Sequence, residues 1–315
     1  MKLLPLLVIV GPTAVGKTDI GIKLAKKLSG EIISADSMQV YKDLNIGTAK
    51  ITPLEMEGIP HHLIDIKEPW ESFSVAEFQQ LVEEKIVEIN QRKHLPILVG
   101  GTGLYVNSVI YNKYNFTPTG EIGNIRKKYQ EVVDNFGTET IHRELAKVDP
   151  ISAEKIHPND AKRIIRALEV YHTTGRPISS FANDKGSDKY NLALIGLNMD
   201  RKLLYERINR RVDLMLEKGW LKEVQDLLNK GIPQDSPALQ GLGYKQLIMY
   251  LNKEISYEKA VEIIKRETRR YAKRQITWFK RENQIQWIDV TNKSKDEIIL
   301  EILPSICRKF QREVE

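Results

Sequence analysis

The segment GPTAVGKT, residues 11–18, follows a continuous apolar run at residues 3–10. It matches the pattern Gly, four residues, Gly, Lys, then Ser or Thr, in which backbone N–H groups and a helix N-terminus face a phosphate. A short apolar run bounded by glycine is typical of a strand buried on both faces of a parallel sheet. The residues that follow place Ile20, Leu24 and Leu28 at helical spacing. The feature therefore predicts a strand, a phosphate loop and a helix.

Strand-like and helix-like segments alternate after this first unit. Such alternation is typical of a doubly wound, mostly parallel α/β sheet, whose ligands lie beyond the carboxyl ends of the strands. We therefore expect a P-loop-containing α/β fold. Further strands are expected at residues 31–36, 61–66, 95–101, 191–200 and 285–290.

The character of the chain changes at residues 113–190, where charged residues dominate and helical stripes replace strand runs. This change indicates a helical insert. We expect the first part of the core at residues 1–112 and the second part, with basic C-terminal helices, at residues 191–315. Long helices are expected at residues 201–230 and 256–282.

The composition favours a protein of a reducing compartment. The single cysteine, Cys307, excludes an intrachain disulfide. No apolar run approaches the roughly 20 residues of a membrane-spanning helix, and the apolar start lacks a signal cleavage site. The formal net charge of +6 is a modest excess. We expect a cytoplasmic monomer with no membrane partner.

The phosphate loop supplies two chemical groups besides its backbone. Lys17 adds a positive charge and Thr18 can hold Mg²⁺. The loop recognises phosphate without specifying ATP, so nucleotide kinases, NTPases and other diphosphate users stay open at this point.

An acidic partner for the loop is expected at the same sheet edge. An NTPase would place a carboxylate after a later strand, but the strand at residues 95–101 continues into Thr102. The nearest acids are Asp36, which directly follows its strand, and Asp65, which lies inside one. We expect Asp36 at the mouth of the phosphate site and Asp65 in a capping role.

Six sequence blocks resemble, in the same order, the motifs of bacterial tRNA dimethylallyltransferases. The likeness covers residues 6–282, and several blocks in order are far more specific than one loop. The blocks read GPTAVGKT, SADSMQVYKDLNIGTAK, GIPHHLID, VGGTGLY, NDAKRIIRALE and QGLGYKQ.

The resemblance implies transfer of a five-carbon group from dimethylallyl diphosphate to the exocyclic amine of the tRNA adenine immediately 3′ of the anticodon. Asp36 would be the general base, with Lys17 and Thr102 as further catalytic residues and Mg²⁺ held at Thr18. The diphosphate would be bound by Gly11, Pro12, Thr13, Ala14, Val15, Gly16, Lys17, Thr18 and one of Arg207 and Arg211.

The resemblance also implies contacts with the tRNA anticodon stem-loop. These contacts would come from the run after the second strand, from the insert and from the basic C-terminal helix. The implied residues are Asp36, Ser37, Met38, Gln39, Thr102, Arg126, Lys162, Arg163, Ile164, Ile165, Arg166, Arg270, Lys273 and Arg274.

Two basic segments are compatible with RNA binding in their own right. Eight of the seventeen residues at 265–281 are basic. That helix could equally present a solvated face above an apolar stripe, because Lys and Arg stems often cover core edges. In the insert, Lys162, Arg163 and Arg166 lie close enough to repel one another, so they need either an anion or neutralisation by an acid such as Glu169.

Three alternatives stay open besides tRNA prenylation. The loop would also serve an ATP-dependent small-molecule kinase or a prenyltransferase acting on free adenine nucleotides. A non-catalytic RNA-binding protein could retain the loop as structure, and its RNA affinity would not depend on Lys17.

Overall fold

The computed structural model describes residues 3–111, 122–181 and 189–311. The chain divides into two compact units, one formed by residues 1–110 with 189–315 and the other by residues 111–188. The expected boundary between residues 112 and 113 lies outside the described residues.

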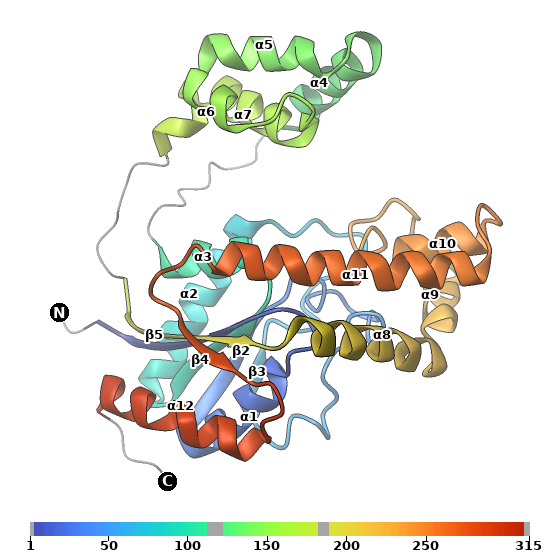
Figure 1. The fold of residues 1–315 in the computed structure, drawn as a ribbon. Helices are drawn as coiled ribbons and strands as arrows, with labels where there is room; N and C mark the ends of the chain where they lie inside the picture. Colours follow the sequence, from blue (N-terminus) through green and yellow to red (C-terminus); the bar gives the residue numbers. More distant parts are fainter. Residues whose placement is uncertain (1–2, 112–121, 182–188, 312–315) are drawn as a thin grey trace. The chain divides into compact units, whose positions relative to one another are not determined.

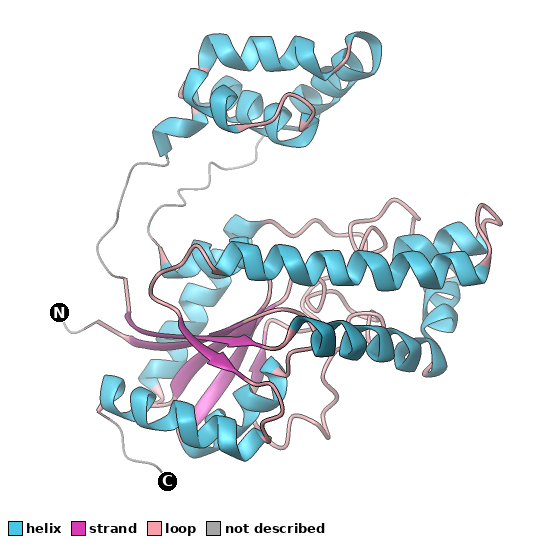
Figure 2. Ribbon diagram, viewed as in Figure 1, coloured by secondary structure: helices cyan, strands magenta, loops and turns pink. Residues whose placement is uncertain are grey.

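The larger unit, here called the core unit, contains one six-stranded sheet in which every pair of neighbouring strands is parallel (Figures 1 and 2). The strand order is β3-β2-β4-β1-β5-β6. This arrangement confirms the predicted α/β class. The strands are β1 (Pro5–Val10), β2 (Gly30–Ala35), β3 (His61–His62), β4 (Leu95–Gly100), β5 (Asn191–Asn198) and β6 (Gln286–Asp289).

Helices cover both faces of this sheet (Figure 1). Alternate residues of β1 point to opposite faces, and Leu7 and Ile9 join the cluster that contains α1 and α12 side chains. The helices α2 and α3 contact each other and β4. The core-unit helices are α1 (Lys17–Lys27), α2 (Val75–Gln91), α3 (Gly103–Ile110), α8 (Arg201–Glu217), α9 (Trp220–Asn229), α10 (Tyr244–Leu251), α11 (Tyr257–Phe279) and α12 (Lys295–Phe310).

The register of the central strands brings three loops together. Gly100 at the end of β4 pairs with Val10 of β1 and with Ala35 of β2. The phosphate loop, Asp36 and Gly101 therefore all begin at one level, at the carboxyl edge of the sheet.

Positive φ angles interrupt two of the expected elements. The strand expected at residues 61–66 ends at His62, because Leu63 and Asp65 have φ of 61° and 55°, outside the β region. The helix expected at residues 201–230 is divided into α8 and α9 by Gly219, whose φ is 97°.

The smaller unit, here called the insert, is helical in its described part. Ile141, Leu145 and Leu168 are buried in its own apolar cluster. Its elements are α4 (Ile122–Phe136), α5 (Thr138–Val148), α6 (Pro150–Lys155), α7 (Ala161–Thr174) and a short 3₁₀ helix at Ile178–Phe181.

Across the described ranges of both units, none of the helices is long and apolar enough to cross a membrane.

Candidate active site

The phosphate loop joins β1 to α1 through a turn that requires glycine. Gly16 is the residue before α1 and has φ of 104°, in the left-handed region that side chains disfavour. The first backbone N–H groups of α1 follow this turn, and the N-terminus of a helix is a favoured position for an anion.

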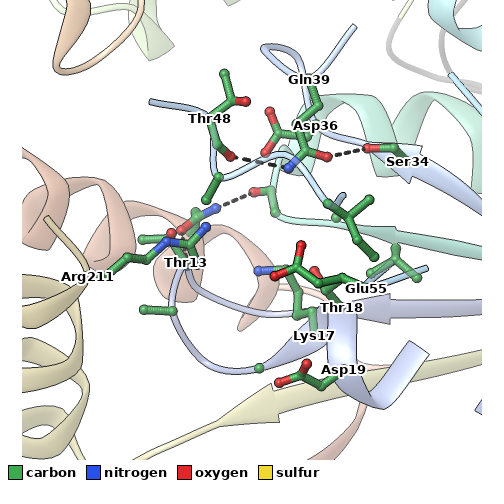
Figure 3. A pocket seen from close by; sticks show the side chains of 18 of the residues that line it. Thr13, Lys17, Thr18, Asp19, Ser34, Asp36, Gln39, Thr48, Glu55 and Arg211 are labelled. Carbon is green, nitrogen blue, oxygen red and sulfur yellow. Dashed lines mark hydrogen bonds between the residues drawn. The ribbon is translucent and has the colours of Figure 1, made fainter. Parts of the chain in front are cut away.

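A polar cavity of about 360 Å³ lies beside this loop (Figure 3). Thr13, Ala14, Gly16, Lys17 and Thr18 line it. The other predicted loop residues, Gly11, Pro12 and Val15, are buried and do not line it.

Lys17 is held by the loop itself. Its Nζ donates to the carbonyl oxygens of Gly11 at 3.0 Å and Pro12 at 2.8 Å. Burial and the nearby Arg211 lower the pKa of Lys17 to about 7, although Asp36 opposes the shift. The free site therefore disfavours the charge that a bound diphosphate would favour.

Arg207 and Arg211 both line the polar cavity. Arg207 is exposed, whereas Arg211 is half-buried and also lines a second cavity. Burial lowers the pKa of Arg211, and Arg207 acts in the same direction. Arg211 reaches from α8 toward the phosphate loop (Figure 3).

Asp36 directly follows β2 and lines both cavities. Its Oδ1 accepts a hydrogen bond from the backbone N–H of Met38 at 2.9 Å. The second cavity, of about 220 Å³, is largely apolar. Ser37, Met38, Met215, Trp220, Leu242 and Tyr244 are among its lining residues.

The predicted residue Thr102 does not line the polar cavity, although the two residues before it, Gly100 and Gly101, do. Its carbonyl oxygen accepts from the N–H of Val106, at the start of α3. Its side chain is near Tyr271, which lines both cavities. Burial and Asp36 raise the pKa of Tyr271 to about 12, with Thr102 opposing the rise.

Gln275 is a site residue that the sequence patterns did not reveal. It is 5% exposed, accepts from the N–H of Thr13 at 2.8 Å and donates to the carbonyl of Gly101 at 2.9 Å. A Cβ at Gly101 would lie 2.1 Å from its Nε2. The only sequence signal is a polar residue on the apolar stripe with Ala272 and Phe279. Gln275 therefore joins α11 to the loops after β1 and β4.

The acidic side chains beside Thr18 do not form a complete metal cage. Asp19, Asp36 and Glu55 line the same cavity. Within the ranges that the structure describes, no three His, Cys, Asp or Glu residues are grouped so that they could hold a metal ion.

The basic residues of α11 have different surroundings. Lys265 pairs with Asp213 at 2.5 Å, and Arg270 pairs with Glu267 at 2.7 Å. Lys273 and Arg274 are exposed, with the Arg274 guanidinium 5.9 Å from the centre of the Tyr271 ring.

In the insert, the structure separates the predicted RNA-binding run into buried and exposed residues. Ile164 is fully buried and Ile165 is 4% exposed, so both side chains belong to the insert core and cannot offer a surface to RNA. This corrects the side-chain part of the expectation for them, because α7 turns those two positions inward. Lys162 and Arg163 are exposed.

Glu169 neutralises part of this basic cluster. It is fully buried and accepts from Arg126 at 2.8 and 3.1 Å. Arg166 lies 3.5 Å from the same carboxylate, and Arg163 pairs with Asp160 at 3.4 Å. Neutralisation by Glu169, the alternative to anion binding, therefore applies to Arg166. Arg126 pairs with the same carboxylate.

Comparison with known proteins identifies the family. The family model described as IPP transferase matches residues 39–282. A tRNA dimethylallyltransferase of Carboxydothermus hydrogenoformans is 52% identical over 300 residues, which cover 95% of this chain and 96% of that relative. The chain belongs to the IPP transferase family. The resemblance inferred from the motif order is confirmed.

Solved structures extend the likeness of this IPP transferase to three dimensions. The full-length tRNA isopentenylpyrophosphate transferase of Bacillus halodurans is 48% identical and matches with a TM-score of 0.75. The match covers 98% of this chain and 97% of that one. A eukaryotic dimethylallyltransferase acting on tRNA is 30% identical and matches with a TM-score of 0.82. The match covers 100% of this chain and 81% of that one.

Proposed function

We propose that this IPP transferase moves the dimethylallyl group of dimethylallyl diphosphate to the exocyclic amine of the tRNA adenine immediately 3′ of the anticodon, and releases diphosphate. The observation that carries the proposal is the position of Asp36. Its carboxylate stands in the shared wall of a polar cavity that suits a diphosphate and an apolar cavity that suits organic groups.

The diphosphate is bound in the polar cavity by the backbone N–H groups of the loop and by Lys17. Arg211 is the better placed of the two candidate arginines, because it is less exposed and lines both cavities. These positive groups stabilise the charge that develops on the diphosphate as the allylic C–O bond breaks and the leaving oxygen keeps the electron pair.

The acceptor amine needs a base at the same wall. An aromatic amine is a weak nucleophile and must lose a proton as its nitrogen bonds to carbon. Asp36 takes that proton as general base. The adenine must leave its stack to reach the cavity, which costs a few kcal/mol and is easier in a loop than in a duplex.

Mg²⁺ fits the position beside Thr18. Mg²⁺ commonly keeps several waters and few protein ligands while it binds phosphate oxygens. Thr18 is exposed at the polar cavity, and the nearby carboxylates of Asp19, Asp36 and Glu55 do not form a cage. This arrangement fits an ion that keeps most of its waters. When bound, the ion adds positive charge to the leaving diphosphate.

The RNA is bound by basic side chains in each unit. In the core unit these are Arg270, Lys273 and Arg274 of α11, and in the insert Lys162 and Arg163. Such contacts position the nucleic acid without reading its sequence. Ser37, Met38 and Gln39 line the cavities and would contact the adenine or its neighbours.

Label transfer tests the proposal. The protein is incubated with Mg²⁺, dimethylallyl diphosphate labelled in its carbon chain and unmodified tRNA, and the tRNA is then digested to locate the label. We expect one labelled adenosine per tRNA, immediately 3′ of the anticodon. Label on a different nucleoside, or none in the tRNA, would contradict the proposal.

Parallel reactions separate the alternatives. A prenyltransferase of free nucleotides would label AMP or ADP in place of tRNA. A kinase would transfer phosphate from ATP without any prenyl donor. A binding protein would retain tRNA with unchanged affinity after Lys17→Ala and transfer nothing.

A further inference from the structure

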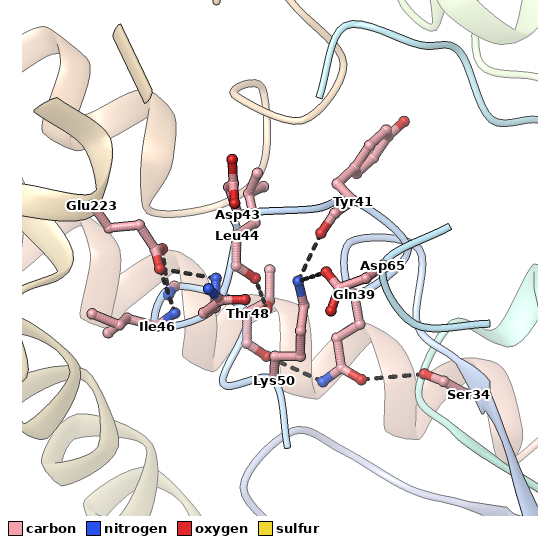
Figure 4. Close-up of polar contacts among 12 residues, drawn as sticks. Ser34, Gln39, Tyr41, Asp43, Leu44, Ile46, Thr48, Lys50, Asp65 and Glu223 are labelled. Carbon is pink, nitrogen blue, oxygen red and sulfur yellow. Dashed lines mark hydrogen bonds and ion pairs between the residues drawn. The ribbon is translucent and has the colours of Figure 1, made fainter. Parts of the chain in front are cut away.

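One carboxylate of α9 accepts hydrogen bonds from the backbone of the loop between β2 and β3. Glu223 Oε2 accepts from the backbone N–H groups of Asn45 at 2.8 Å and Ile46 at 2.6 Å (Figure 4). Its Oε1 accepts from the N–H of Gly47 at 3.0 Å and from the Tyr244 hydroxyl at 2.6 Å. The carboxylate thus accepts hydrogen bonds from three successive backbone amides and from one phenol hydroxyl.

Close packing fixes the same loop against α9 and α10. A Cβ at Gly47 would lie 2.0 Å from Trp220 Nε1 and 2.5 Å from the Tyr244 ring, so only glycine fits. Trp220 and Tyr244 are themselves buried. Burial and the Glu223 charge raise the pKa of the Tyr244 phenol, which keeps it a hydrogen-bond donor.

The anchored loop continues into the wall of the reaction site. Gly47 lines the apolar cavity and Thr48 lines both cavities, whereas Glu223 lines neither. The Thr48 carbonyl accepts from Gln39 Nε2 at 3.3 Å, and Gln39 Oε1 accepts from the Ser34 hydroxyl at 3.2 Å (Figure 4). A hydrogen-bonded path therefore joins the anchored loop to the end of β2.

We propose that Glu223 is a positioning residue that sets the position, relative to Asp36, of the cavity wall formed by Gly47, Thr48 and Gln39. This inference rests on the proposed transfer reaction. Glu223 contacts no reacting atom in this scheme, and its carboxylate acts through the three amides that it holds. Loss of the anchor should misplace the acceptor adenine relative to Asp36 while leaving the phosphate loop intact.

The test compares Glu223→Gln with Asp226→Asn. Both variants remove one negative charge from α9, but Asp226 pairs with the exposed Lys222 and lines neither of the two cavities. In Glu223→Gln, the amide group cannot accept from all three N–H groups and the phenol. We expect single-turnover dimethylallyl transfer to fall about tenfold to a hundredfold, since small misplacements of reactants have such effects.

Diphosphate affinity separates positioning from general damage. We expect the Kd for inorganic diphosphate with Mg²⁺ to stay within about twofold of wild type in both variants, and transfer by Asp226→Asn to be normal. An unchanged transfer rate in Glu223→Gln, or an equal loss in Asp226→Asn, would overturn the proposal. So would a loss of diphosphate affinity as large as the loss in rate.

Amide hydrogen exchange tests the anchor without depending on transfer, and its wild-type arm does not depend on the folding of a variant. In the wild-type protein, we expect the amides of Asn45, Ile46 and Gly47 to be protected. In folded Glu223→Gln, they should exchange faster while α1 is unchanged. Rapid wild-type exchange would overturn the anchor, whereas protected amides in a protein that transfers no prenyl group would mean that the proposed function alone has failed.

Discussion

Buried charge is neutralised differently at the two ends of the parallel strands, here called the amino edge and the carboxyl edge of the sheet. At the amino edge, the buried Glu31 accepts from Arg92 at 2.8 and 3.1 Å and lies 2.7 Å from ring nitrogens of His62 and His94. Burial tends to raise the pKa of Glu31, but these hydrogen bonds outweigh it and lower the pKa to about 2. This edge is therefore neutralised within the protein.

At the carboxyl edge, the positive groups are not matched in this way. Burial lowers the pKa of both Lys17 and Arg211, and each is further lowered by a neighbouring cation. Asp36 opposes the shift in both cases without removing it. Removal of one member of a buried charge cluster that is satisfied internally destabilises the fold, whereas a cluster that needs an anion is typical of a binding site.

Asp36→Asn should separate chemistry from binding at the carboxyl edge. The substitution keeps the side-chain size but removes the proton acceptor, so we expect transfer to slow by about 10²–10⁴-fold. Diphosphate affinity should change little, because Asp36 is not a phosphate ligand in this scheme. Single-turnover transfer over a magnesium series is the measurement. Relief by excess magnesium would indicate a metal-binding role, and a near-normal rate throughout would remove Asp36 from the mechanism.

Lys17→Met should affect the donor more than the fold. It removes a positive group that stabilises the leaving diphosphate, so we expect kcat/KM for dimethylallyl diphosphate to fall by about 10²–10³-fold. The melting temperature should change little, because loss of a charge that burial disfavours offsets loss of the two hydrogen bonds to the carbonyls of Gly11 and Pro12. Unaltered kinetics at limiting donor would exclude Lys17 from phosphate binding.

Glu31→Gln should have the opposite profile. We expect the free energy of unfolding to fall by about 1–3 kcal/mol at pH 7, because the buried carboxylate that accepts both hydrogen bonds from Arg92 is lost, while the transfer rate stays the same. Glu88→Gln is the control at the same edge, since the Glu88 side chain is 45% exposed and pairs with Lys85.

The sign of the pH dependence follows from the lowered pKa. Glu31 contributes fully above its ordinary pKa of 4.5, and the contribution is lost as pH falls toward about 2. Urea unfolding across this range should show the difference between wild type and Glu31→Gln shrinking as the pH falls. A constant difference would show that the carboxylate charge is not what stabilises this edge.

The insert offers a smaller-scale comparison of free and paired cations. Each lost phosphate contact should reduce the slope of log tRNA affinity against log salt by about 0.7–0.9. We expect that reduction for Lys162→Ala and a smaller one for Arg166→Ala, because Arg166 lies beside the buried Glu169. An unchanged slope after Lys162, Arg163 and Arg166 are replaced together would mean that this face does not contact RNA.

The sequence predicts the sheet well where the pattern is local. The apolar run before residues 11–18 and the spacing of the following helix are sufficient to predict β1, the loop and α1. It fails at residues 63–65 and at Gly219, because a few positive φ angles interrupt patterns that otherwise continue as strand and helix.

The site is less predictable than the sheet. Asp36 follows directly from its position after a strand. Gln275 and Glu223 do not follow from the sequence in this way. The backbone partners of Gln275 lie 174 and 262 residues away, and those of Glu223 lie 176 to 178 residues away. No local periodicity reports such pairs, whose roles depend on how helices after the insert return to loops before it.

Proton uptake on diphosphate binding tests the carboxyl-edge account most directly. With a pKa of about 7, most Lys17 side chains are neutral at pH 8 before binding, and a bound diphosphate should restore their charge. Calorimetry with inorganic diphosphate and Mg²⁺, in buffers of different ionisation enthalpy, counts the protons taken up. The account predicts that wild type takes up nearly one proton more than Lys17→Met at pH 8. Equal proton counts for the two proteins would contradict it.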